Sequence, residues 1–203
     1  MDETARKYVD LFRSVKIASA ATVDTAGHPR TRIVNVMLAD DSGMYLVASK
    51  GKPFYRQMVE TGEVALSAMC PECQSLKFLG KCRVVGKEWL DRIFDANPGL
   101  AEVYPGDTRY ILDAFHVYEG AGEWFDLLHH PISRETFAFG GTPEERPGFC
   151  ITDACTGCGA CLDTCPQQCI REGSPYVIEW EHCLQCGACF DTCPADAVER
   201  LHA

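Results

Sequence analysis

The chain has 203 residues, of which 46% are hydrophobic and 10% aromatic, with 29 acidic residues against 19 basic ones. This composition excludes a disordered chain, and the length allows one sizeable core together with a second, smaller domain. The formal net charge of −10 disfavours a nucleic-acid-binding protein.

The first residues, MDETARKYVDLF, predict an amphipathic helix with Ala5, Tyr8, Val9 and Phe12 on one face. This start is too polar for a signal peptide, and no apolar run reaches membrane-spanning length. We therefore expect a cytoplasmic protein with no membrane association. Its 13 cysteines would then lie in a reducing environment rather than form disulfides.

The next segment predicts an antiparallel sheet or barrel. Strands are expected at 16–23, 30–39 and 44–48, separated by turns rich in Asp and Gly. The loop Ser49-Lys-Gly-Lys-Pro then leads into a short helix at 54–60. The later elements expected in this part are strands at 63–69 and 75–85, a helix at 88–96, and strands around 111–128 that break near Gly120.

Two stretches in this order, ATVDTAGHPRTRIV and MYLVASKGKPFYRQM, resemble the FMN-binding split barrel of the pyridoxamine 5′-phosphate oxidase-like superfamily. The resemblance covers about residues 1–128 and implies a homodimer with flavin at the subunit interface. It also implies that Arg32 and Lys52 neutralise the flavin phosphate. The further residues implied are Ser49 as a hydroxyl donor, Lys50 as a weaker phosphate ligand, and Val34 and Val47 on adjacent strands along the flavin ring. Residues of the second subunit would complete the site, with Gln57 and Trp124 as candidates.

The chemistry of a phosphate agrees with these residue types. A phosphate monoester carries nearly two negative charges near neutral pH, so its site needs cations and N–H donors, and the helix N-terminus after the SKGKP loop would supply the donors. Each basic residue alone is equally typical of a solvated surface. A tryptophan on the last strand is also common in a core or an interface.

Three cysteines of this part, Cys70, Cys73 and Cys82, belong to no larger motif. The CPEC sequence could bind a metal or act as a redox dithiol. Because no second CxxC lies nearby, free thiols in a reducing cytoplasm are the simpler interpretation. The segment 131–149 is rich in proline and glycine and predicts a connector, which Phe137 and Phe139 would hold against the barrel.

The C-terminal part contains an internal repeat. CTGCGACLDTCP, beginning at Cys155, recurs as CLQCGACFDTCP, beginning at Cys183. Each copy has three cysteines spaced three residues apart, then a fourth cysteine four residues later and a proline. From about Phe149 to Ala203 the chain resembles the bacterial ferredoxins with two 4Fe-4S clusters, in which each fourth cysteine binds the other cluster.

Geometry supports the crossed arrangement. The four irons of a cubane point to the corners of a tetrahedron, and a CxxCxxC loop can wrap only three of them. We therefore expect two ligand sets, Cys155, Cys158, Cys161 and Cys193 for one cluster and Cys183, Cys186, Cys189 and Cys165 for the other. Zinc or a disulfide framework would be the alternatives, but neither requires this spacing.

The residues around the cysteines carry further expectations. Gly157, Gly159 and Gly187 suit backbone that turns closely around a cluster. Residues 175–181 predict one strand of a hairpin, and the QQCI and ADAV segments after each CP predict helical turns. Cys169 occupies the repeat position of Ala197, which favours a small buried hydrophobic residue over a ligand.

The negative charge is concentrated in the C-terminal part. From Cys150 onward there are eight acidic residues against two arginines and no lysine. Such a surface suits an electron carrier that docks on basic patches of a redox partner. It would equally keep a small domain soluble.

Together these patterns predict a mainly β protein with helices (α+β). An FMN-binding split barrel at 1–130 and a connector at 131–149 would precede a small ferredoxin-like two-cluster domain at 150–203. The expected function is an oxidoreductase that passes electrons between two 4Fe-4S clusters and FMN, with an external donor or acceptor that the sequence does not identify.

Other functions remain open at this stage. A non-catalytic electron carrier linking two protein partners is the main alternative. A barrel that serves as a dimerisation scaffold, or that holds haem or another ligand, is a further one. True pyridoxamine phosphate oxidase activity is not expected, because the cysteine repeat stands where a substrate-binding segment of that enzyme would lie, and no catalytic acid or base can be named.

Overall fold

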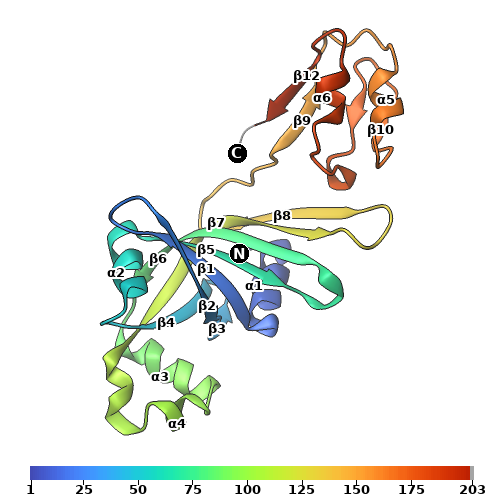
Figure 1. Ribbon diagram of the computed structural model, residues 1–203. Helices are drawn as coiled ribbons and strands as arrows, with labels where there is room; N and C mark the ends of the chain where they lie inside the picture. Colours follow the sequence, from blue (N-terminus) through green and yellow to red (C-terminus); the bar gives the residue numbers. More distant parts are fainter. Residues whose placement is uncertain (202–203) are drawn as a thin grey trace. The chain divides into compact units, whose positions relative to one another are not determined.

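The computed structural model describes residues 1–201 and divides into two compact units. The N-terminal unit comprises residues 1–124 and 137–144, and the C-terminal unit comprises residues 125–136 and those from 145 onward (Figure 1). The segment expected as a connector, 131–149, is thus divided between the units. The last two residues of the chain lie outside the described part.

Helix α1 (Glu3–Val15) forms as the sequence predicts. Asp2 caps it, because its Oδ1 accepts a hydrogen bond from the Ala5 backbone N–H at 2.8 Å. The four expected residues of one helix face are all buried, and they line the main core of the N-terminal unit: Ala5, Tyr8, Val9 and Phe12. The apolar spacing therefore fixed both the helix and the face that it buries.

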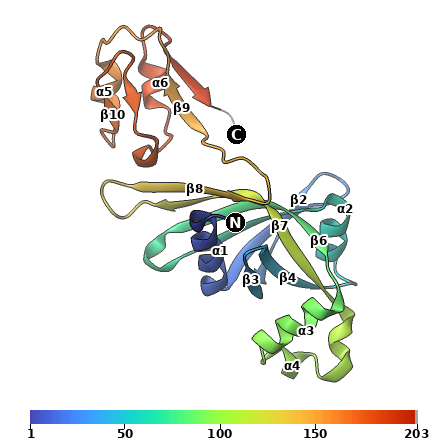
Figure 2. The same ribbon diagram turned by 180° about the vertical axis from the view of Figure 1, so that it is seen from behind.

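Most of the N-terminal unit is built on one curled antiparallel sheet with the strand order β2-β1-β5-β6-β7-β4-β3, and β8 pairs with β7 (Figure 2). The end of β7 and the start of β8 belong to the C-terminal unit. The strands are β1 (Ile17–Val23), β2 (Pro29–Asn35), β3 (Leu38–Asp40), β4 (Gly43–Ser49), β5 (Glu63–Met69), β6 (Ser75–Val84), β7 (Leu112–Asp126) and β8 (Ser133–Phe139). This confirms the mainly β architecture. The strand expected at 30–39 is interrupted between β2 and β3, where the Met37 N–H bonds to the Tyr45 carbonyl instead.

Strand β7 corrects one expectation. The chain continues as a strand through Gly120, where a break was predicted. A Cβ at Gly120 would lie 2.3 Å from the Leu79 carbonyl oxygen on β6, and the residue has φ +155°. The glycine therefore allows two backbones to approach closely rather than ending the strand.

Three helices lie between strands of the sheet along the chain, one between β4 and β5 and two between β6 and β7. They are α2 (Pro53–Thr61), α3 (Lys87–Ala96) and α4 (Leu100–Val103), with short 3-10 turns η1 (Pro71–Cys73) and η2 (Gly106–Ile111). Helices α3 and α4 lie together beyond the ends of β4 and β7 (Figure 1). There they cover a second apolar cluster, in which the Trp89 ring stacks on Tyr45 and Tyr45 on His116, with centroid distances of 4.3 and 4.6 Å.

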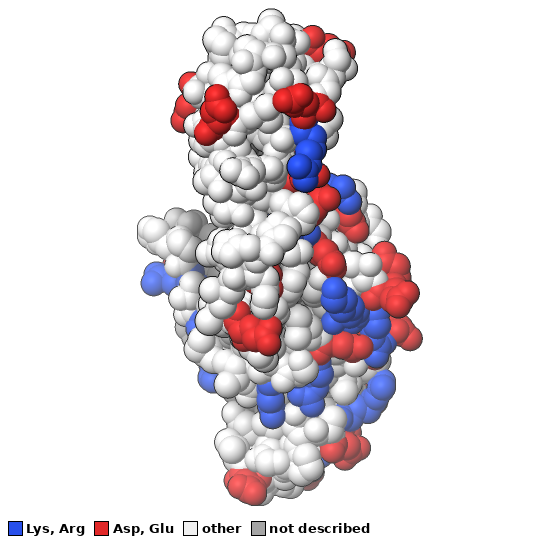
Figure 3. All heavy atoms as spheres, turned by 90° about the vertical axis from the view of Figure 1, so that its right-hand side faces the viewer, with Lys and Arg blue, Asp and Glu red and all other residues white. Residues whose placement is uncertain are grey.

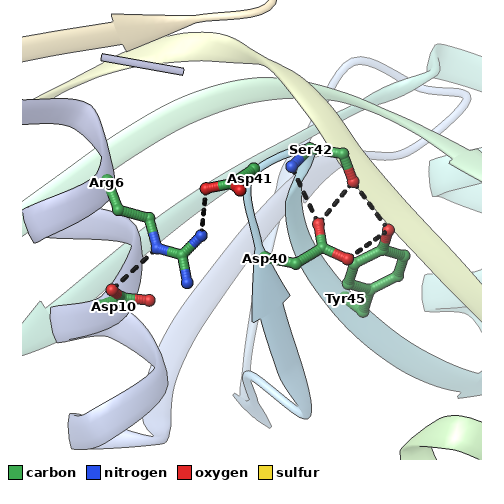
Figure 4. Close-up of polar contacts among 6 residues, drawn as sticks. All are labelled: Arg6, Asp10, Asp40, Asp41, Ser42 and Tyr45. Carbon is green, nitrogen blue, oxygen red and sulfur yellow. Dashed lines mark hydrogen bonds and ion pairs between the residues drawn. The ribbon is translucent and has the colours of Figure 1, made fainter. Parts of the chain in front are cut away.

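The turn between β3 and β4 is held by its own side chains, as Figure 4 shows. The Asp40 carboxylate accepts hydrogen bonds from the Ser42 backbone N–H at 2.9 Å and from the Ser42 hydroxyl at 2.5 Å. The Ser42 hydroxyl also lies 2.9 Å from the Tyr45 hydroxyl. From α1, the Arg6 guanidinium pairs with Asp10 at 2.8 Å and with Asp41. The turn predicted from Asp40-Asp-Ser-Gly is therefore confirmed, and it is tied to α1.

The C-terminal unit contains two small antiparallel ribbons and two one-turn helices. Its elements are β9 (Gly148–Ile151), α5 (Ala160–Thr164), β10 (Ile170–Arg171), β11 (Val177–Ile178), η3 (Trp180–His182), α6 (Ala188–Thr192) and β12 (Val198–Leu201). Strand β9 pairs with β12, and β10 pairs with β11. The hairpin is confirmed, although its second strand is shorter than expected.

The helical turns lie on the other side of the fourth cysteines from where we expected them. Helices α5 and α6 precede Cys165 and Cys193, whereas the QQCI and ADAV segments turn and enter β10 and β12. Each proline after the fourth cysteine lacks an N–H to continue the helix. Gln168 and Asp196, at equivalent repeat positions, then adopt φ of +51° and +48°, which redirects the chain into a strand.

Among the described residues, none of the helices is both long and apolar enough to cross a membrane.

Phe137 should be a main source of stability in the N-terminal unit. Its fully buried ring stacks on Tyr8 at 4.9 Å and on Phe78 at 5.9 Å. Phe137→Ala should lower the free energy of unfolding by about 3–5 kcal/mol, because it leaves a cavity in a packed core. Guanidinium unfolding followed by far-UV circular dichroism measures this loss. Val103→Ala, at a side chain that is 67% exposed, is the control and should change the value by less than about 0.5 kcal/mol.

Candidate cofactor sites

Two hollows in the C-terminal unit are each lined by four of the cysteines that the sequence predicts as ligands. The cysteines of one hollow, called here the first cysteine set, are Cys155, Cys158, Cys161 and Cys193. Those of the other hollow, the second cysteine set, are Cys165, Cys183, Cys186 and Cys189. In both hollows the structure thus brings the fourth cysteine of one repeat together with the first three cysteines of the other repeat.

Backbone conformation positions the cysteine loops. Gly159 and Gly187 lie immediately before α5 and α6 with φ of +83° and +81°, a region that residues with a Cβ rarely adopt. Gly157 also has a positive φ, and Gln185 takes its place in the second repeat with φ +57°. The tight turns expected at the three glycines are therefore confirmed.

Backbone N–H groups point at cysteine sulfurs in both sets. The Gln185 N–H donates to the Cys183 Sγ at 3.3 Å, and the Ala197 N–H donates to the Cys193 Sγ at 3.3 Å. Hydrogen bonds of this kind disperse the negative charge of a thiolate. The sulfurs are thus prepared to be held as anions.

Burial opposes that charge in both sets. Desolvation raises the pKa of the Cys189 thiol to about 11, and it raises the pKa of Cys161 as well. Thiolates in these hollows therefore need a positively charged group beside them, which the irons of a cluster provide. Four cysteines around one hollow fit such a group in number and in chemistry.

Cys169 is the residue that sequence reasoning missed. It is buried, as expected, but it also lines the hollow of the second cysteine set, with its Sγ 3.6 Å from the Cys165 Sγ. A hydrogen bond between Cys169 and Cys183 lowers the pKa of Cys183 to about 6 and raises that of Cys169. The sequence held a signal for this difference. The second repeat has Ala197 at the position of Cys169, and alanine has no thiol that could form such a bond.

The second candidate site, on the N-terminal unit, centres on Arg32 of β2. The Arg32 guanidinium donates to the Thr22 hydroxyl at 2.6 Å and to the Gln57 side-chain oxygen at 2.9 Å. It also lies 4.5 Å from the centroid of the Phe54 ring. Partial burial lowers the pKa of Arg32 through desolvation. An anion near this partly dehydrated cation would be bound more strongly than one at a solvated surface.

The N-terminus of α2 lies beside Arg32, since Phe54 belongs to its first turn. Lys52 is the N-cap residue, its side chain is exposed, and its backbone N–H bonds to the Ser49 carbonyl at 3.0 Å. Lys50 points elsewhere, because its ammonium lies 3.3 Å from the Asp113 carboxylate. The structure therefore gathers Arg32, Ser49 and Lys52 around one helix end, whereas Lys50 is engaged by β7.

The two valines that were expected along the flavin ring pack in different places. Val34 packs against the main core, and Val47 packs against the second apolar cluster, which α3 covers. Their strands, β2 and β4, are not hydrogen-bonded neighbours, so the expectation of adjacent strands is wrong, although the two strands approach each other across the barrel. Trp124 stacks on Tyr8 with a centroid distance of 6.2 Å, which is a packing role.

These residue types fit a phosphate-bearing cofactor. Arg32 and Lys52 supply positive charge, Ser49 supplies a hydroxyl, and α2 presents the positive end of its dipole. Gln57 is buried and already bonded to Thr22 and Arg32, so its role within one chain is to position the arginine.

A family model described as a 4Fe-4S dicluster domain matches residues 154–197. This part of the C-terminal unit is similar to 4Fe-4S dicluster domains. Both cysteine sets lie within the matched residues. No curated protein sequence is similar enough to the chain to count as a relative.

Solved structures resemble the N-terminal part of the chain. A NimC/NimA family protein from Clostridium acetobutylicum is 18% identical, with a TM-score of 0.57 over 68% of this chain and 94% of its own. A protein from the same organism, related to general stress protein 26 of B. subtilis and assigned to the pyridoxinephosphate oxidase family, is 16% identical, with a TM-score of 0.53 over 68% and 97%. PhzG from Burkholderia lata, in complex with tetrahydrophenazine-1-carboxylic acid, is 12% identical, with a TM-score of 0.51 over 66% and 81%. These likenesses confirm the split-barrel fold, and the dicluster domain follows it.

The cysteines outside the two sets have contrasting environments. Cys70 is buried at the end of β5, and desolvation raises its pKa. Cys73 is exposed in η1, with φ +59°. Cys82 is buried on β6, and desolvation raises its pKa to about 12.

These environments predict how the thiols respond to reagents and to pH. In native protein at pH 8, iodoacetamide should modify Cys73 well before Cys82, because only thiolates react. An unfolded Cys82 thiol ionises near pH 9 and the native one near pH 12, so the native state loses stability as pH rises through this interval.

Site-resolved mass spectrometry measures the order of labelling. Urea unfolding between pH 8 and 11 measures the loss of stability, which Cys82→Ala should reduce and the control Cys73→Ala should not. Labelling of Cys82 as fast as Cys73 would contradict its burial.

Proposed function

We propose that the protein is an oxidoreductase that passes electrons between two 4Fe-4S clusters and FMN. The observation that carries this proposal is the pair of four-cysteine hollows on the same chain as a split barrel with a basic helix end. Clusters of this type transfer single electrons, whereas a flavin accepts one or two, so the pair can connect one-electron and two-electron partners.

In this proposal each cysteine set holds one cluster. The first and second sets provide four thiolates each, and the N–H groups of Ala197 and Gln185 stabilise the Cys193 and Cys183 sulfurs. Because each set takes one cysteine from the other repeat, neither cluster binds to a single repeat alone. The dicluster match and the two hollows support this assignment.

The flavin would bind through its phosphate at the start of α2. Arg32 and Lys52 would balance the two negative charges, and the Ser49 hydroxyl would donate to a phosphate oxygen. Lys50 remains a weaker ligand, since it would first have to leave Asp113. Val34, Val47 and the Gln57 of either subunit stay candidates for contacts to the ring.

A second copy of the chain would complete the site. The outward faces of β1, β2, β5 and β6 expose large apolar side chains, namely Ile33, Met69 and Leu79, among small residues such as Ala21 and Ala65. An exposed apolar sheet face of this kind favours burial against a partner. A homodimer in a reducing cytoplasm is therefore part of the proposal, with a redox protein or a small molecule as external donor or acceptor.

The alternative is an electron carrier without a small-molecule substrate. The acidic side chains of the C-terminal unit favour it, since they would dock on a basic partner; on the face shown in Figure 3 this unit carries more acidic than basic groups. Turnover with a panel of small acceptors separates the two functions. Exchange of electrons with proteins alone would favour the carrier.

Anaerobic purification tests the proposal directly. About eight iron ions and about one FMN per chain are expected, four irons for each cluster. When the clusters are then reduced, the flavin absorbance should bleach without any added mediator. Bound flavin that stays oxidised beside reduced clusters would overturn the proposed electron path, and four irons would mean that one cysteine set is wrong.

Arg32→Gln should weaken FMN binding by on the order of tenfold to hundredfold, since a hydrogen bond to a charged group contributes about 1.5–3 kcal/mol. Arg30→Gln is the matched control, because Arg30 lies on the same strand but pairs with Asp24 at 2.8 Å. Fluorescence quenching of FMN titrated with flavin-free protein measures both affinities. Equal losses in the two variants would contradict a specific role for Arg32.

A further inference from the structure

The two cysteine sets differ in their surroundings although their sequences repeat. The C-terminal unit includes residues 125–136 in addition to the repeat, and one basic side chain of this segment, Arg134 on β8, contacts the loop of the second cysteine set. Arg134 lies outside the two repeated segments, so the repeat does not place an equivalent arginine beside the first cysteine set. The two sites are thus electrostatically different.

Three of the contacts that Arg134 makes help to hold it in place. Its Nη2 donates to the Cys183 carbonyl oxygen at 3.3 Å, and its guanidinium carbon lies 4.4 Å from the Phe125 ring centroid and 5.5 Å from that of Trp180. The residue is only 5% exposed. A second bond, between His182 Nδ1 and the Ile132 carbonyl oxygen at 2.8 Å, fixes the same segment against the same loop.

A buried guanidinium acts strongly on a nearby redox group. Arginine remains charged at all relevant pH values, and a charge that is removed from water is screened little. Reduction of a cluster adds one electron, so the site gains one negative charge. A fixed positive charge beside one cluster therefore makes that cluster easier to reduce, since cluster potentials depend on local charge and hydrogen bonding.

We propose that Arg134 gives the cluster site of the second cysteine set the higher reduction potential, so that an electron entering the unit settles there. This inference rests on the proposed two-cluster function and adds a direction to it. Cys169 acts in the same sense, because its thiol lies 3.6 Å from the Cys165 sulfur of the second set, whereas Ala197 occupies the equivalent position at the first set.

Removing the charge of Arg134 tests the inference. Full-length protein, purified anaerobically with its clusters, is titrated with dithionite and followed by low-temperature electron paramagnetic resonance. The wild type should be reduced in two separate one-electron steps. In Arg134→Gln the upper step should move to lower potential by about tenfold in the equilibrium constant, which is about 59 mV for a one-electron couple.

Two variants serve as controls. Arg134→Lys keeps the positive charge while losing the planar stack, so it should retain most of the upper potential. Arg146→Gln removes an exposed arginine whose guanidinium carbon lies 5.6 Å from the Trp180 ring centroid. Because solvent screens this charge, the variant should leave both reduction steps unchanged.

The outcomes distinguish this inference from the proposed function. An upper step that stays in place in Arg134→Gln, or an equal shift of both steps, would overturn the role of Arg134 while leaving the two-cluster function intact. Wild-type protein with fewer than about eight irons per chain would overturn the two-cluster function itself, and the inference with it. Iron analysis of every variant shows whether a lost step reflects a lost cluster instead of a shifted one.

Discussion

Each hollow of the C-terminal unit needs a cysteine from the other repeat, and the rest of this unit depends on that exchange. Helices α5 and α6 end immediately before Cys165 and Cys193, so the spacing between the helices decides whether either set can assemble. The ribbons β9–β12 and β10–β11 hold that spacing with backbone hydrogen bonds. In the proposed function metal binding would therefore be coupled to folding, since either cluster would join both repeats.

Partly dehydrated arginines are common to the two candidate sites. Arg32 lies between β2 and the start of α2, and Arg134 lies between two aromatic rings beside Cys183. Hydrogen bonds to oxygen acceptors help to fix both guanidinium groups: the Gln57 side-chain oxygen accepts from Arg32, and the Cys183 carbonyl oxygen accepts from Arg134. The acidic excess of the C-terminal unit makes a buried cation there especially influential, because surface carboxylates are screened by water and Arg134 is not.

The sequence predicted the features that depend on local spacing. The cysteine pattern, the α1 face and the order of strands all follow from periodicity, and the structure agrees with each of them. The features it missed depend on contacts between distant segments. Gly120 allows β7 to pass close to Leu79, and Arg134 reaches Cys183 across 49 positions of the chain, which no local pattern encodes.

The two repeats show the same limit on a smaller scale. Comparison of Cys169 with Ala197 identified a buried position, but the hydrogen bond to Cys183 arises only when β10 and the second repeat come together. The placement of the helical turns before the fourth cysteines was also missed, because the left-handed residues Gln168 and Asp196 carry no glycine signal.

The pairing of β9 with β12 has a consequence for how such a chain could arise. Gly148 and Leu201, which lie at the two ends of the repeat region, are partners in the register of this ribbon. A module whose entry and exit points lie side by side can be joined to another protein at one place without disturbing the host's own backbone.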